Sequence, residues 1–431
     1  PAAQAGETPA PSLAISASAA APYYAGTYAE GGSIYLPDTL LFPEQIDLRF
    51  PGTNRFYGVN AWSPGSLALT NGTAKFQETG FLLNVTNDVF LRGPKGMLAL
   101  TGATVTVGGS MVVSNGSLVD MAISPSTGSS LSVSGLLTLD GGSLRYRFDR
   151  NNCRSLALAG GVALTNGGQL ILHSGPTNAA QPEYGGLLAL SGMDLVVPTN
   201  CAVYLYSEPT NGGSVKIEGR HVTVCGGGLL SADAGGFSAG ISNHPNGYGP
   251  GFGYRGANSG GGGGYGGVGG KGGHPDSYPG TNYGSAVLPL MPGSGGGDWR
   301  GTSVNAGYGG GLIWIQASGI VTLDGTISAN GSSPSGYQGA GSGGGIYILC
   351  RKFAGSQSGI LRANGGYGGS ESGGGGGGRI AVECVSMQWA YTNNVSVNGG
   401  GASGTGGSQP GTAGTVEWIK RMPGGTVFVA R

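Results

Sequence analysis

The feature that most constrains the fold is an internal repeat of short alternating strands and glycine-rich corners. In the C-terminal third the unit reads strand, loop, strand, Ala-Asn-Gly and glycine tract, and it restarts at Gly311, Gly345 and Gly378, 33 or 34 residues apart. Each strand alternates in polarity, as in Ile346–Cys350, and therefore has one apolar face. A unit this short buries such a face only by stacking on neighbouring units.

A looser form of the unit recurs earlier in the chain, where short apolar strands end at marker glycines. We therefore predict an all-β fold, a parallel β-helix (β-solenoid) of about 8–10 rungs with right-handed winding and glycine-rich loops packed along one edge. A β-sandwich of hairpins is the alternative, and it favours two-residue Asn-Gly turns between strands of equal length. The marker glycines are Gly102, Gly135, Gly160, Gly192 and Gly219.

Composition excludes several classes of protein. Glycine supplies 94 of the 431 residues but not every third position, so collagen is excluded. The 21 basic residues balance 21 acidic ones, which argues against nucleic-acid binding and against disorder driven by charge. A hydrophobic content of 39% is ample for a core. No apolar run reaches the roughly 18 residues of a membrane helix, so we predict no transmembrane segment.

These patterns divide the chain into five regions. The first contains the alternating stretch around Leu13 and Ile15, either a disordered arm or a strand donated to a neighbouring subunit. The terminal stretch with Val427 and Val429 is predicted to meet such a neighbour. The regions are an N-terminal arm (1–21), a cap with the first irregular rungs (22–95), solenoid rungs (96–233), a glycine-rich insertion (234–310) and glycine-rich solenoid repeats (311–431).

The glycine tracts allow two interpretations. They are either flexible linkers or extended polyglycine-II helices, in which missing side chains let backbones pack closely. All the tracts leave the solenoid after an equivalent corner and carry spaced tyrosines such as Tyr265, Tyr308 and Tyr367, which favours the packed interpretation. A phosphate-binding loop is not expected, because no Lys-Ser/Thr pair follows at the required spacing.

The repeats at 309–331, 343–366 and 376–400, which end in "SANG", "RANGG" or "VNGG", resemble the glycine-rich β-helix repeats of large secreted or cell-surface bacterial proteins. The tracts also look like the glycine-rich lattices of some phage adhesins and of certain receptor ectodomains. The resemblance implies a solenoid architecture and an extracellular or cell-surface location, and it assigns no catalytic residue. The chain begins with Pro1, which we interpret as the product of signal-peptide removal.

Five cysteines are too few for a disulfide framework. Cys350 and Cys384 occupy equivalent positions of successive repeats, and rungs about 4.8 Å apart lie within the Cα range of a disulfide. Cys201 and Cys225 fall at nearly the same corner of consecutive rungs. Either pair is bridged or it forms an unbonded stack, and Cys153 has no evident partner.

Enzymatic chemistry is weakly supported. Many β-helix proteins act on polysaccharides, but acidic residues are sparse here, and the densest polar cluster joins 298–300 with 274–276. A salt bridge or a sugar-stacking surface explains that cluster more simply than catalysis does. The four histidines lack metal-ligand spacing, so we expect no metal and no cofactor.

We therefore expect a secreted, non-enzymatic structural protein that binds itself and forms an extracellular filament or surface layer through β contacts. The first alternative is an adhesin that binds glycans through Tyr265 and Trp299 in the glycine-rich region. The second is a polysaccharide lyase or hydrolase that depends on Asp298. Low charge favours close packing of subunits.

Overall fold

The computed structural model describes residues 33–36, 45–46, 52–56, 58–76, 78–122, 128–149, 155–179, 181–190, 192–241, 243–299, 306–389 and 392–422. The chain forms two compact units, residues 1–171 and 172–431. The described residues consist of strands, turns and two short 3-10 helices, η2 (Thr392–Asn394) and η3 (Thr405–Gly407). None of their helices is long or apolar enough to cross a membrane.

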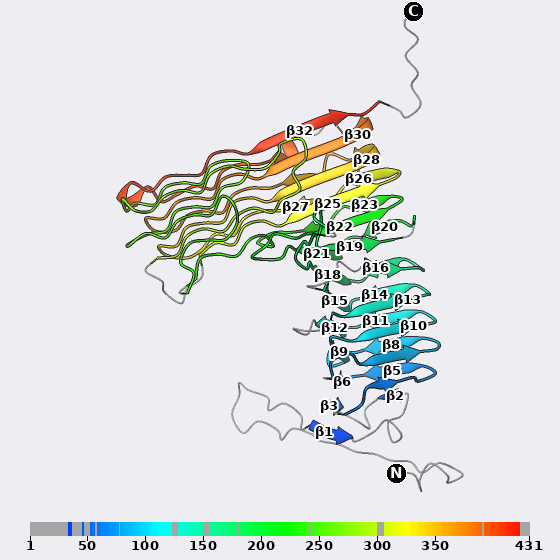
Figure 1. The fold of residues 1–431 in the computed structure, drawn as a ribbon. Coiled ribbons are helices and arrows are strands. Elements are labelled where there is room, and N and C mark those ends of the chain that lie inside the picture. Colours follow the sequence, from blue (N-terminus) through cyan, green and yellow to red (C-terminus); the bar gives the residue numbers. More distant parts are fainter. Residues whose placement is uncertain are drawn as a thin grey trace, which may run out of the picture. The chain divides into compact units, whose positions relative to one another are not determined.

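Unit 1 is built from short strands that repeat in groups of three (Figure 1). Its described strands are β1 (Ser33–Leu36), β2 (Gln45–Ile46), β3 (Gly52–Phe56), β4 (Ala61–Trp62), β5 (Leu67–Thr70), β6 (Gly72–Phe76), β7 (Leu82–Val85), β8 (Val89–Arg92), β9 (Met97–Thr101), β10 (Thr104–Val107), β11 (Met111–Ser114), β12 (Leu118–Ala122), β13 (Ser130–Val133), β14 (Leu137–Asp140), β15 (Ser143–Arg147), β16 (Ser155–Leu158) and β17 (Val162–Thr165). Strand β18 (Gln169–His173) spans the boundary between the units.

Each described strand from β2 to β14 pairs in parallel with the strand three places further along the chain, and β1 pairs in parallel with β3. The three resulting sheets run β1-β3-β6-β9-β12-β15, β2-β5-β8-β11-β14-β17 and β4-β7-β10-β13-β16. Inward residues stack in register, as Leu83, Val105 and Leu131 do, and all three are buried. This is the parallel β-helix expected from the repeats. Burial of each such side chain stabilises the folded state by about 1.5–3 kcal/mol.

Left-handed residues make many of the corners. Asn115 and Gly116, between β11 and β12, have φ values of 55° and 81°. Such an Asn-Gly pair is typical of a hairpin turn, yet here it joins strands of different sheets. The β-sandwich alternative is therefore wrong, because the pair bends one rung rather than folding a strand back on its neighbour.

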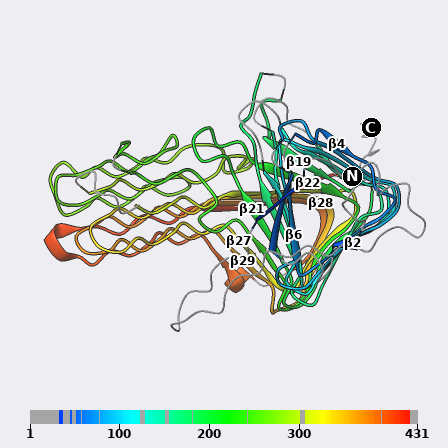
Figure 2. The same cartoon turned by 90° about the horizontal axis from the view of Figure 1, so that it is seen from below.

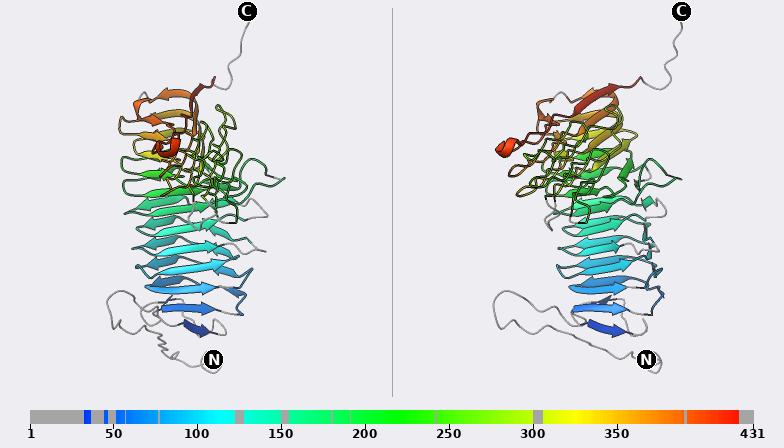
Figure 3. Two further views of the ribbon diagram at one scale, coloured as in Figure 1. Left: turned by 90° about the vertical axis from the view of Figure 1, so that its left-hand side faces the viewer. Right: turned by 60° about the vertical axis from the view of Figure 1, so that its left-hand side comes forward.

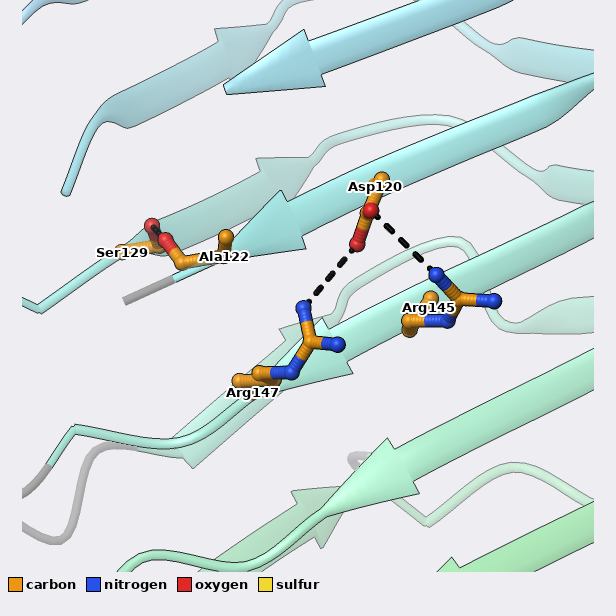
Figure 4. A network of polar contacts seen from close by, with 5 residues as sticks. All are labelled: Asp120, Ala122, Ser129, Arg145 and Arg147. Atoms are coloured by element: carbon orange, nitrogen blue, oxygen red, sulfur yellow. Dashed lines mark hydrogen bonds and ion pairs between the residues drawn. The ribbon is translucent and has the colours of Figure 1, made fainter. Parts of the chain in front are cut away.

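One charged cluster lies on the sheet formed by β12 and β15 (Figure 4). Asp120 accepts from Arg145 Nη1 at 3.3 Å and from Arg147 Nη1 at 3.2 Å, so one carboxylate joins two cations of the next rung. Nearby, Tyr146 points inward, is fully buried, and donates its hydroxyl to the Ser129 carbonyl at 2.9 Å. Alternate residues of one strand thus serve the surface and the core.

Unit 2 continues the same strand pattern with longer strands (Figure 1). Two sheets run β21-β24-β27-β29-β31 and β19-β22-β25-β28-β30-β32, and β20-β23-β26 joins the second half of β28. The described strands are β19 (Gly186–Ala189), β20 (Leu195–Val197), β21 (Ala202–Tyr206), β22 (Val215–Gly219), β23 (Val222–Val224), β24 (Leu229–Ser231), β25 (Leu312–Ala317), β26 (Ile320–Leu323), β27 (Thr326–Ser328), β28 (Gly345–Gly355), β29 (Ile360–Arg362), β30 (Arg379–Gln388), β31 (Val395–Ser396) and β32 (Thr415–Lys420).

Both faces of the sheet β22-β25-β28-β30 are buried. One face carries the column Ile217, Ile315, Ile348 and Val382, all fully buried. The opposite face carries a second cluster of Leu312, Trp314, Tyr347 and Ala381, against which Tyr184 and Leu290 pack. The second layer explains why β25 reads as a nearly continuous apolar run rather than an alternating one.

The glycine tracts of unit 2 form an ordered lattice beside the strands (Figures 1 and 2). In the tract 373–378, consecutive N–H groups donate to three different neighbouring tracts, and every third residue returns to the same neighbour. This threefold period is that of the polyglycine-II helix, so the packed interpretation is confirmed for these tracts. The acceptors are the carbonyls of Gly260, Gln409, Gly366, Gly263, Thr412 and Ala363, in that order.

Glycine is required in this lattice because neighbouring backbones leave no room for a side chain. A Cβ atom placed on Gly375 would lie 1.9 Å from the carbonyl oxygen of Gly341, and one on Gly260 would lie 2.0 Å from that of Gly297. Figure 3 shows tracts from the insertion crossing between tracts of the later repeats. The lattice therefore ties residues 236–311 to the repeats that follow them.

An asparagine ladder explains the recurring Ala-Asn-Gly corner. Asp233 Oδ1 accepts the N–H of Asn330 at 2.6 Å, Asn330 Oδ1 accepts that of Asn364 at 2.8 Å, and Asn364 Oδ1 accepts that of Asn398 at 2.8 Å. Each corner side chain thus caps the backbone of the next rung.

Replacing Asn364 by alanine is expected to lower the free energy of unfolding by about 0.5–1.5 kcal/mol, because it removes the acceptor of the Asn398 N–H, which is exposed and can bond to water instead. It also removes the 3.0 Å bond from Asn364 Nδ2 to Ser396 Oγ. Asn364→Asp retains the acceptor and is expected to cost less. Urea unfolding of both variants measures the difference, and equal stability would show that the ladder contributes nothing.

Candidate functional site

Strand β32, the last described strand, pairs along one edge and has no strand partner along the other among the described residues. Its partner is β30. The N–H groups of Thr415 and Arg421 donate to the carbonyls of Gly378 and Cys384, so odd-numbered residues face β30. Because successive residues of a strand face opposite sides, the N–H groups of Val416, Trp418 and Lys420 point to the unpaired edge. An edge of this kind is a template for another strand.

An aromatic residue of the same strand is partly exposed to solvent. Trp418 continues the buried Ile-Val column of β25, β28 and β30, yet its side chain is 37% exposed. It packs on Trp389 at a ring separation of 5.8 Å, and Trp389 packs on the buried ring of Phe353 at 5.4 Å. A cavity of about 500 Å³ is lined by these two tryptophans together with Cys384 and Met387. Apolar surface that other rungs bury therefore reaches solvent here.

Tyr265 does not occupy the position that we predicted for a glycan contact. It is fully buried, its ring lies 4.8 Å from that of Tyr283, and the Arg379 guanidinium lies 5.6 Å from its centroid. Burial raises the pKa of its hydroxyl well above the ordinary value. Arg379 also donates to the Tyr283 carbonyl and to Thr415 Oγ1, so this group joins the insertion to β30 and β32. Tyr265 therefore has a packing role and offers no surface to a ligand.

Trp299 is half-buried and has an aromatic neighbour, Tyr337, at 4.9 Å. Asp298 beside it is fully buried, and its Oδ1 accepts the Trp299 N–H at 2.7 Å. His274 and Asp276 form an ion pair with each other. The polar side chains of the predicted cluster thus bond to neighbouring residues of the same cluster. Among the described residues, no group of three or more His, Cys, Asp or Glu side chains is arranged to hold a metal ion.

Cys350 and Cys384 are register partners on β28 and β30, as the repeat alignment predicts, and both thiols are free. In-register parallel strands separate Cβ atoms by about the 4.8 Å strand spacing, which exceeds the 3.5–4.5 Å Cβ separation of a disulfide. Burial, followed by the neighbouring Cys384, raises the pKa of Cys350 to about 12. The structure therefore holds the unbonded stack, and the protonated thiol is a poor nucleophile at neutral pH.

Cys201 and Cys225 are also free. Cys201 directly precedes Ala202, the register partner of Leu229, whereas Cys225 lies four residues before Leu229. The two residues are therefore out of register at their corner. Of the two alternatives left open for this pair, a bridge or an unbonded stack in register, the structure therefore shows neither.

The residues that we assigned to assembly from the sequence, Leu13, Ile15, Val427 and Val429, lie outside the described residues, as does Cys153. Sequence reasoning did not single out β32 or Trp418. The available signal was the run Val416–Ile419, which opens another repeat.

Sequence reasoning also missed two exposed tyrosines in the insertion, Tyr254 and Tyr278. Comparison with known proteins found no matching family model, no similar curated protein and no similar solved structure. The geometry of the chain therefore carries the functional argument.

Proposed function

We propose that this chain is a non-enzymatic structural protein of the cell exterior whose copies join through strand edges into a filament or layer. The observation that carries the proposal is the terminal strand β32, which presents unpaired N–H groups beside the half-exposed Trp418. Pairing this edge with a strand and covering Trp418 would give the last rung the environment that earlier rungs have.

The corner of the last rung supports addition of further structure. Asn398 is exposed and ends the ladder in which each corner side chain accepts the N–H of the next rung. Strand β31 likewise pairs only with β29 among the described residues. Within the described part of the chain, two sheets and one corner thus reach their last members at the same rung.

A second copy is the partner that we propose. Its segment around Leu13 and Ile15 has the alternation of an added strand and no strand partner nearby in sequence. A contact between the start of one copy and the end of another is head-to-tail, and it repeats without closing into a filament. Formal net charge of zero leaves little electrostatic repulsion between copies.

Sedimentation velocity of the full chain over a range of concentrations tests the proposal. We expect the weight-average mass to rise with concentration from that of the 42.6 kDa monomer. A monomer at every concentration would contradict assembly. Because hydrophobic burial and backbone pairing drive the contact, moderate salt should not dissolve the assemblies.

A further inference from the structure

Three tyrosines of the glycine lattice, two in the insertion and one in a later repeat, expose much of their side chains to solvent. Tyr254, Tyr278 and Tyr337 are 42%, 57% and 37% exposed, whereas Tyr265 in the same lattice is fully buried. The Tyr254 and Tyr278 rings meet edge to face at 6.1 Å, and Tyr337 lies against Trp299. We call these four residues, Tyr254, Tyr278, Trp299 and Tyr337, the tyrosine patch.

Backbone bonds of the glycine lattice hold the two aromatic pairs of the patch together. The N–H of Tyr254 donates to the Tyr278 carbonyl at 3.0 Å. The consecutive residues Gly260 and Gly261 donate to the carbonyls of Tyr337 and Tyr254, at 2.7 and 2.9 Å. The rings therefore belong to neighbouring tracts that are hydrogen-bonded to one another. This order lowers the conformational entropy that the side chains would lose when a ligand binds.

Unsatisfied polar atoms lie next to the exposed rings. Gln338, adjacent to Tyr337, is 3% exposed, and its Oε1 has no hydrogen-bond partner among the described residues. Ser277, adjacent to Tyr278, is fully buried, and its Oγ is also without a partner in this part of the chain. Both atoms are closed to solvent, so a ligand would meet the exposed rings and the exposed polar groups around them rather than these two atoms.

The charges around the patch are few and mixed. Arg255 is an exposed cation, while Asp276 pairs with His274 and accepts the N–H of Ala257. Among the described residues, this set offers no cluster of cations to a phosphate, sulfate or acidic sugar. Surfaces rich in Tyr, Ser, Gly and Asn recognise ligands through rigid ring faces and short polar groups. A pyranose ring matches such a surface, because its C–H face is apolar and its rim carries hydroxyl groups.

We propose that the tyrosine patch binds a neutral oligosaccharide, whose pyranose rings stack on Tyr254 and Tyr278 while hydroxyl groups bond to polar atoms around them. This activity goes beyond self-assembly and does not depend on it. The proposal differs from our sequence-based expectation of glycan binding in its residues, because Tyr265 is buried and Trp299 serves as the half-buried support of Tyr337.

Titration calorimetry of the full chain tests the proposal with cellohexaose, chitohexaose and mannohexaose as neutral probes and a hexamer of galacturonic acid as the acidic one. We expect at least one neutral hexasaccharide to bind. We expect the double variant Tyr254→Ala/Tyr278→Ala to bind it with an affinity that is lower by a factor of about ten or more. Tyr254→Phe/Tyr278→Phe keeps the rings and should retain most of the affinity. Melting temperatures of the variants verify that each is folded.

Tyr367→Ala is the matched control. Tyr367 is 51% exposed on another glycine tract, where its N–H donates to Ser333 Oγ at 2.8 Å. Within the described part of the chain it makes no ring contact or hydrogen bond with the patch residues, so its loss should leave affinity unchanged. The proposal is overturned if no neutral hexasaccharide binds, if only the acidic hexamer binds, or if the patch variant and the control bind equally well. Assembly measured on the same samples is expected to be unaffected by either substitution.

Discussion

Replacing Gly400 by alanine is expected to disrupt the glycine lattice and to lower the melting temperature of the protein by roughly 6–12 °C. A Cβ atom at this position would lie 1.7 Å from the carbonyl oxygen and 2.5 Å from the carbonyl carbon of Gly366. Both atoms belong to backbone that is hydrogen-bonded on its other sides, so neither moves without breaking further bonds. The cost should therefore reach at least the upper end of the about 1–3 kcal/mol typical of an overpacked core.

Gly226→Ala is the matched control for this substitution. A Cβ atom on the exposed Gly226 would meet only the Asp324 carbonyl oxygen at 3.9 Å, an ordinary contact, and its backbone is not left-handed. We expect its melting temperature to stay close to that of the unaltered protein. Differential scanning calorimetry compares the two variants, and equal melting temperatures would show that the lattice does not contribute to stability.

Replacing Val416 by proline is expected to abolish assembly while leaving the solenoid folded. The Val416 N–H points to the unpaired edge of β32, so proline there removes a donor that a new strand would need and spares the bonds to β30. Trp418 and Lys420 offer their N–H groups at the same edge, and the proline ring also hinders close approach of a strand.

Val416→Ala is the control, because it shortens the same half-buried side chain and keeps the N–H. Sedimentation velocity is expected to show monomers for the proline variant and assemblies for the alanine variant. Assemblies of equal size in both would contradict the role of the β32 edge.

Much of the architecture follows from the sequence. The recurring corner glycines and alternating strands predicted a parallel solenoid, and the alignment of repeats placed Cys350 and Cys384 in register. Those inferences succeed because a rung repeats at nearly constant length, so equivalent residues stack. Cys201 and Cys225 are out of register because they lie at opposite ends of equivalent four-residue corners, 198–201 and 225–228.

Whether a single side chain within the glycine tracts is buried or exposed was harder to predict. In a polyglycine-II lattice a residue faces one of three neighbouring tracts, and those neighbours come from remote parts of the chain, as Gly260 and Gly373 do. No local alternation of polarity reveals which neighbour that is. Tyr265 was therefore assigned to the surface although it is buried, and the exposed Tyr278 was not recognised.

The continuous apolar run of β25 has a related cause. Its second face is covered by Tyr184 and by Leu290 of the insertion, and no pattern within Leu312–Ala317 states what covers that face. Sequence periodicity thus reports burial toward the solenoid core, whereas burial beneath an inserted segment depends on how that segment folds back.

The proposal that copies join end to end is tested most directly by negative-stain electron microscopy of the full chain beside a chain that lacks residues 1–21. The account predicts filaments for the full chain and dispersed particles once the segment with Leu13 and Ile15 is removed. Dispersed particles in both samples, at concentrations up to the solubility limit, would contradict the proposed assembly.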